Sequence, residues 1–139
     1  MKYILAFCLF LVISFGYSQN FNGDYRSNST SFKSEIDSTQ NFREETLFNV
    51  AIIIDDIKDS MIAIQDPRIP EKLLIYKIES YTGILNNKGY DMHIYKAITE
   101  HLTTPKEITI VLYHDLDKNL NIMVSSSESS QTFFDLEKQ

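Results

Sequence analysis

The feature that most constrains the fold is an alternation of apolar and polar side chains along the second half of the chain. It is clearest in the runs ITIVLY at 108–113 and LNIMVS at 120–125, where every second residue is a large aliphatic. Successive side chains of a β-strand point to opposite faces of the sheet, so this period of two predicts strands with one buried face. The segment Asp115–Asn119 between the two runs has the composition of a turn.

The same reading extends along most of the chain. Strands are expected at 21–25, 47–55, 60–65, 72–81, 108–113, 120–125 and 132–136. Turn signals separate them, and no strand alternates with a helical pattern, so the pattern predicts an all-β antiparallel meander. A sheet of seven or eight strands must hide its edges. We therefore expect a small barrel or strongly curved sheet, with a two-sheet sandwich as the alternative.

Residues 90–102 fit two structures. Ile94, Ala97, Ile98 and Leu102 have helical spacing, and Asp91 is placed to cap such a helix. A strand fits equally well, with Ile94 two residues beyond Met92. The turn Asn86–Gly89 before this stretch and the strand after it favour the strand.

The segment 19–45 is mostly polar, and only one short strand is expected in it, followed by a long loop. That strand carries the spacing Phe21-x-Gly23-x-Tyr25 ahead of the meander. The arrangement resembles lipocalin-like barrels, with Tyr25 where those proteins have an aromatic residue, usually tryptophan. The resemblance covers five residues and the general architecture, and it implies a barrel.

The first 18 residues have the pattern of a secretory signal peptide. Lys2 precedes an apolar run from Tyr3 to Phe15, and Gly16 and Ser18 place small residues before a cleavage site at Ser18–Gln19. The expected mature product is a single domain, residues 19–139, with its β-domain core at 46–139. A glutamine at the new N-terminus and the lack of disulfides are typical of a bacterial envelope protein, so we expect a secreted or periplasmic protein.

Removal of residues 1–18 also limits the kinds of reactive group that the mature chain can contain. Cys8 is the only cysteine, so the mature chain would have no disulfide, thiol nucleophile or thiolate metal site. Phe7 stands where a lipid-modified cysteine needs a small residue. Loss of Lys2 leaves 12 basic against 19 acidic residues, a net charge of −7, and the basic residues are scattered. Nucleic acid is therefore an unexpected partner, and no apolar run after residue 18 is long enough to span a bilayer.

No motif indicates catalysis, a cofactor or a metal site. Asp115, Asp117 and Asn119 have the spacing that opens a calcium loop, but Leu120 and Ser126 replace its glycine and glutamate. A hairpin turn explains them, with a weak cation site as the alternative. The imidazoles His93, His101 and His114 lack metal-ligand spacing. His114 precedes Asp115, which could orient a base, but there is no G-x-S-x-G nucleophile motif.

Tyrosine and methionine side chains on a curved sheet can line an apolar pocket; the alternative is that they fill the core. The candidate ligand-lining residues are Tyr76, Tyr90, Met92, Tyr113 and Met123.

The sequence therefore predicts an exported non-catalytic domain that binds a small apolar ligand or an envelope partner. The alternative is a structural or protein-interaction module that acts through an exposed edge strand, and a hydrolase is the third possibility. An open internal cavity of about 300 Å³ or more would favour the carrier, and a filled interior with a long unpaired edge would favour the interaction module.

Overall fold

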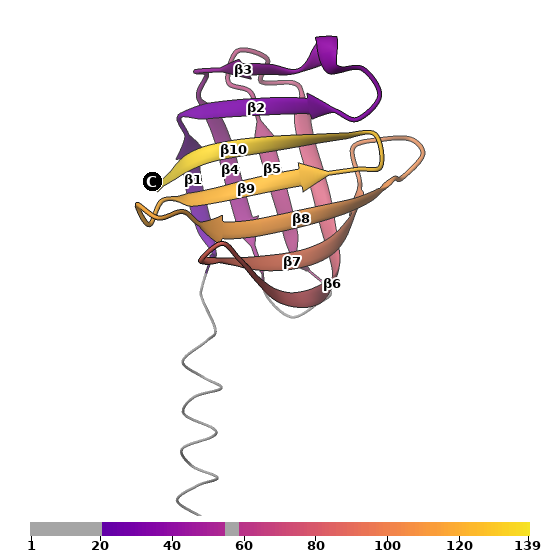
Figure 1. Ribbon diagram of the computed structural model, residues 1–139. Helices are drawn as coiled ribbons and strands as arrows, with labels where there is room; N and C mark the ends of the chain where they lie inside the picture. The colour runs from indigo at the N-terminus through magenta and orange to yellow at the C-terminus, as the bar shows by residue number, and fades with distance from the viewer. Residues whose placement is uncertain (1–20, 55–58) are drawn as a thin grey trace, which may run out of the picture.

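The computed structural model describes residues 21–54 and 59–139, and Figure 1 shows them as a single curved sheet. The expected leader and its cleavage site, Ser18–Gln19, lie outside the described residues. Within them there is no α-helix, and all strands pair antiparallel. The elements are β1 (Gly23–Ser27), β2 (Ser29–Ser34), the 3₁₀ turn η1 (Ser38–Gln40), β3 (Phe42–Glu44), β4 (Phe48–Ile53), β5 (Met61–Gln65), β6 (Leu73–Asn87), β7 (Tyr90–Thr99), β8 (Glu107–His114), β9 (Leu120–Ser125) and β10 (Ser129–Lys138).

The meander closes into a barrel because the first strand pairs with the last. Tyr25 lies opposite Lys138 and Arg26 opposite Glu137. β1 and β2 are separated by Asn28 alone and both run along β10, while β4 pairs with β1 and β3 with β2. The ten strands therefore make eight continuous barrel strands. The predicted barrel is confirmed, and the two-sheet sandwich is not adopted.

The ambiguous stretch is a strand. β7 begins at Tyr90 and pairs with β6 and β8 along its length, so the helix alternative for residues 90–102 is wrong. The β6–β7 turn consists of Lys88 and Gly89, both at positive φ (52° and 86°). A two-residue turn with both central residues left-handed matches the twist of the strands that it joins, which favours the hairpin over a helix.

The polar N-terminal segment requires a correction. One short strand was expected in residues 19–45, but β1, β2, η1 and β3 all lie there. β2 is rich in Ser and Thr and has no apolar alternation, so its sequence gives no strand signal. Its backbone pairs with β10, and the Thr30 hydroxyl donates to the Thr132 carbonyl over 2.9 Å. Tertiary pairing therefore forms this strand where local sequence does not predict one.

Side chains from all eight barrel strands fill the interior. One ladder across the sheet consists of His93, Leu112, Ile122 and Phe133, which lie opposite one another in register. All four are buried, as are Val50, Ile52, Ile62, Ile64 and Ile110 from the other strands. The face that carries these residues is therefore the inner face, and residues one position along each strand belong to the outer face.

Candidate interaction surface

The five candidate ligand-lining residues do not share one side of the sheet. Tyr76 lies on the inner face, 7% exposed, and burial raises its pKa to about 12. Tyr90, Met92, Tyr113 and Met123 lie on the outer face, because each is an odd number of positions along its strand from a residue of the buried ladder. The barrel therefore separates Tyr76 from the other four, which gather outside it.

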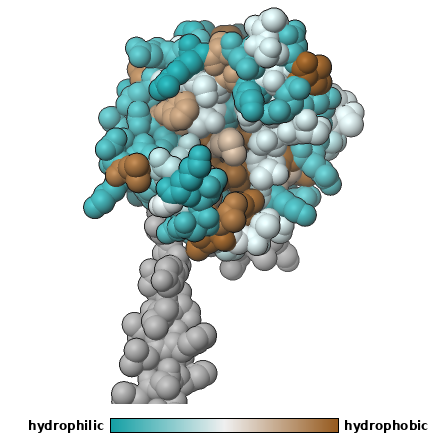
Figure 2. Space-filling model, viewed as in Figure 1, coloured by the Kyte–Doolittle hydropathy of each residue, from teal (hydrophilic) through white to brown (hydrophobic). Residues whose placement is uncertain are grey.

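These four residues belong to a continuous apolar area on the outside of β6–β9. Met92 lies opposite Leu85 on one side and Tyr113 on the other, and Ile94 and Met123 both lie opposite Val111. The rings of Tyr90 and Tyr113 meet edge to face, with their centroids 6.1 Å apart. Figure 2 shows a brown area low on the barrel, where Figure 1 places β6 to β8. We call this area the outer apolar face: Leu85, Tyr90, Met92, Ile94, Val111, Tyr113 and Met123.

The outer apolar face ends at an unpaired strand edge. β5 pairs with β6 only from Leu73 to Lys77, followed by one hydrogen bond from the Ile78 amide to the Ser60 carbonyl. β7 continues to pair with the opposite side of β6 as far as Asn87. Among the residues that the structure describes, none pairs with the free side of β6 from 79 to 87. We call this segment the β6 edge.

The β6 edge exposes large side chains on both faces. Tyr81 lies opposite Tyr95 and Ile84 opposite His93, so both extend the inner face beyond the closed part of the barrel. They are 51% and 47% exposed, and Leu85 on the outer face is 53% exposed. Register shifts between Ile78 and Ser80, and between Tyr81 and Gly83, mark two bulges in this strand. From Ser80 to Asn87 the edge contains neither a charged residue nor a proline.

Two of the three histidines meet at the end of the barrel where β1 begins. The Phe21 ring lies 5.0 Å from that of His93 and 6.0 Å from that of His114. His93 is buried, its Nδ1 lies 3.2 Å from the Tyr81 hydroxyl, and burial lowers its pKa. His101 lies at the opposite end, where its Nδ1 is 3.1 Å from the Ile75 amide nitrogen. The three imidazoles therefore do not form one site.

The aspartate beside His114 is engaged in its own turn. Asp115 Oδ1 accepts hydrogen bonds from the amides of Asp117 and Asn119, over 2.9 and 3.0 Å. Its Oδ2 lies 3.3 Å from Nδ2 of Asn121. This carboxylate therefore holds the β8–β9 turn. Over residues 21–54 and 59–139, no group of three His, Cys, Asp or Glu side chains is arranged to hold a metal ion.

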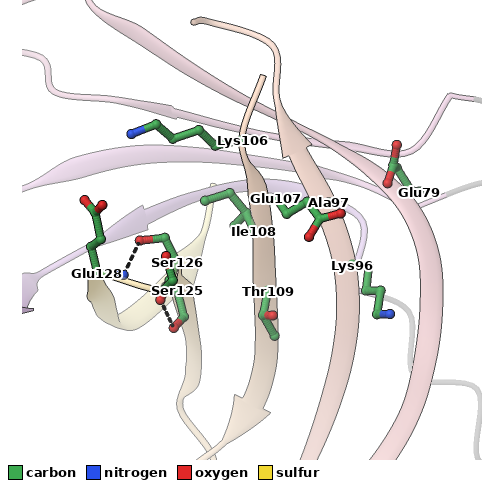
Figure 3. A pocket seen from close by; sticks show the side chains of 11 residues that line it. Glu79, Lys96, Ala97, Lys106, Glu107, Ile108, Thr109, Ser125, Ser126 and Glu128 are labelled. Carbon is green, nitrogen blue, oxygen red and sulfur yellow. Dashed lines mark hydrogen bonds between the residues drawn. The ribbon is translucent and has the colours of Figure 1, made fainter. Parts of the chain in front are cut away.

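A polar groove of about 670 Å³ lies on the outer surface beside the β9–β10 turn. Figure 3 shows three of its lining residues, Lys96, Thr109 and Ser125, on adjacent strands, with Glu128 on the far side of Ser125. Lys96, Thr109 and Ser125 are neighbours in the sheet register. Ser126 accepts hydrogen bonds from the amides of Glu128 and Ser129, so its hydroxyl closes the turn. The groove mixes three glutamates with two lysines, which gives it no preferred charge of ligand.

A second hollow, about 390 Å³, opens at the end of the barrel near Phe21. Tyr25, Leu120 and Leu136 form its apolar floor, and Lys118 and Lys138 lie on its rim. Tyr25 belongs to the barrel core, and its hydroxyl donates to the Phe21 carbonyl over 2.8 Å. None of the five candidate ligand-lining residues contributes to this hollow.

Sequence reasoning did not anticipate the β6 edge. The strand was expected at 72–81, where the side chains alternate, and the next predicted feature was the turn Asn86–Gly89. The hairpin instead extends to Asn87, and Gly83, at φ 134°, occupies a bulge. The sequence feature that could have indicated the longer strand was the apolar pair Ile84–Leu85 directly before the turn.

Comparison with known proteins adds no family to this description. No protein-family model matches the sequence, and no curated protein or solved structure is similar to it. No helix among the described residues is long and apolar enough to cross a bilayer. The functional argument therefore depends on the site itself.

Proposed function

We propose that this chain is an exported, non-catalytic β-domain that binds another polypeptide along the β6 edge. The observation that carries the proposal is the segment 79–87: β5 pairs with β6 only as far as Lys77, and beyond Ile78 no described residue pairs with that side of β6. Unpaired amide and carbonyl groups along a strand edge can hydrogen-bond an added strand. The partner would complete the sheet on that side.

The composition of the edge supports this function. Natural sheet proteins protect exposed edges with charged residues, prolines, bulges or short strands. The two bulges twist the β6 edge, but charge and proline are absent from Ser80 to Asn87. The half-exposed Tyr81, Ile84 and Leu85 would become buried against an added strand, and burial of apolar surface is favourable.

Binding of a small apolar ligand, which belongs to the first function that the sequence predicts, has less support. Its requirement was an open interior lined by the candidate tyrosines, but Tyr76 is packed in a core with Ile62, Ile64 and Ile78. The other candidates lie on the outer apolar face, adjacent to the β6 edge. They are better placed to support a protein contact than to line a cavity.

Photo-crosslinking tests the proposal directly. A photoreactive phenylalanine analogue at Ile84, in the full chain expressed with its leader, is expected to form a covalent adduct with a polypeptide. The matched control is the same analogue at Ile69, which is 43% exposed against 47% for Ile84 but lies at the opposite end of the barrel. Adducts at 84 and not at 69 support the proposal. No adduct at 84, or equal adducts at both positions, would exclude the β6 edge as the binding surface.

A further inference from the structure

We infer that the polypeptide bound at the β6 edge is a second copy of this chain, paired antiparallel. The inference rests on the proposed function and names its partner. It follows from three properties of the segment 79–88: the order of its charges, the apolar character of both its faces, and the closure that a symmetric pair provides.

The charges at the two ends of the segment have opposite sign. Glu79 precedes the uncharged stretch and Lys88 follows it. Antiparallel pairing of two copies brings Glu79 of each near Lys88 of the other, while parallel pairing brings like charges together. Both residues are exposed, so each ion pair contributes little stability, but like charges across strands are unfavourable. The order of the charges therefore selects the antiparallel orientation.

The uncharged stretch also suits a protein that is acidic overall. The chain has a net charge of −6, so the overall electrostatic interaction between two copies is repulsive. Along the β6 edge from Ser80 to Asn87 there is no charge to repel. Within this segment of β6 itself, no carboxylate would oppose another where the two copies pair.

An added strand must be apolar on both faces. One of its faces continues the inner face beside Tyr81 and Ile84, and the other continues the outer apolar face beside Leu85. The segment 81–85 itself has this property. A two-fold axis perpendicular to the sheet places this segment opposite itself, and such a contact closes as a dimer without leaving a free β6 edge for further addition.

Sedimentation velocity of the purified protein tests the inference. The wild type is expected to shift from monomer to dimer with rising concentration. Leu85→Lys should raise the dimer dissociation constant at least about tenfold, because the charge enters both copies. The control Leu73→Lys makes the same change at a residue that is 44% exposed in the β5-paired half of β6, and should leave the constant unchanged. Circular dichroism should show equal folding of both variants.

A charge exchange tests the orientation. Glu79→Lys alone and Lys88→Glu alone should each weaken the dimer, because each brings like charges together at both ends. The double variant should recover the wild-type constant. No recovery in a folded double variant would overturn the antiparallel arrangement.

The outcomes separate this inference from the proposed function. A monomer at all concentrations up to about 1 mM, with a crosslink at Ile84 to a different polypeptide, overturns the second copy and keeps the β6 edge as the binding surface. A dimer that is insensitive to Leu85→Lys also overturns the inference. No adduct at Ile84 overturns both proposals. An adduct of twice the monomer mass supports both.

Discussion

His93 lies in an environment that its sequence position does not indicate. As a polar residue between the apolar Met92 and Ile94, it would be expected on the exposed face of its strand. It is instead only 6% exposed and contacts the rings of Phe21 and Tyr81. Burial is the main cause of its lowered pKa, and the nearby His114 lowers it further, while Asp91 acts in the opposite direction. The neutral imidazole is therefore the form that the folded protein favours.

The stability of the protein should depend on pH through this residue. The unfolded chain binds a proton at His93 near its usual pKa of 6.5, and the folded chain binds it only at lower pH. The free energy of unfolding should therefore decrease as pH falls below about 6.5. His93→Gln should remove this part of the decrease, as measured by urea unfolding at several pH values. A difference between the two proteins that stays constant across this range would contradict the prediction.

Residue-level expectations succeeded where burial follows from alternation. Ile108, Ile110 and Leu112 were expected to share a face, and all three lie in the core. Asn121 was expected on the polar face of its strand, but it is 1% exposed. Its Oδ1 accepts a hydrogen bond from the Asp135 amide, at the bulge of β10 where Asp135 has a φ of 53°. A contact with a residue 14 positions away leaves no local signal.

At the scale of elements, the turns were the most predictable features. The segment 115–119 was expected to be a turn, and the Asp115 carboxylate closes it through two amides. A short acidic side chain favours such a turn because it accepts hydrogen bonds from amides two to four residues further along the chain. β7 was predictable for a similar reason, because the turn before it requires a hairpin.

Loss of the Asp115 carboxylate should weaken this turn. Asp115→Ala leaves the two amides without their side-chain acceptor, so the free energy of unfolding should fall by about 1–2 kcal/mol. Asp117→Ala, an exposed position in the same turn, should change it by less than about 0.5 kcal/mol. Chemical denaturation of both variants checks this comparison. Equal effects would show that the turn does not depend on the carboxylate of Asp115.

At the scale of the whole molecule, the barrel closes between segments that are far apart in the sequence. β1 pairs with the end of β10, and the Gln139 amide donates to the Asp24 carbonyl over 2.8 Å. β10 also pairs with β2, whose polar residues gave no strand signal. Closure removes the edges of β1 and β10, but β6 extends beyond β5, and no residue in the described part of the chain pairs with that extension on the β5 side.

The proposed export concerns the whole chain and has its own test. Cleavage between Ser18 and Gln19 should release a product that begins at residue 19, which the intact mass of the secreted or periplasmic protein would show. Ser18→Tyr places a bulky side chain next to the cleavage site, and the leader should then be retained. A mature protein that still begins at Met1, or a lipid adduct on Cys8, would overturn the predicted cleavage and localisation.

The sequence alone determined the all-β class, the main turns and the strand character of the second half, because each depends on a period of two or on short-range hydrogen bonds. The tertiary structure decided the rest. β2 and β3 form because their backbones pair with neighbouring strands, and His93 and Asn121 are buried by contacts that are distant in the sequence. Four of the five candidate ligand-lining residues lie outside the barrel. Alternation shows which residues share a face, but only closure of the sheet decides which face is inside and which edge stays open.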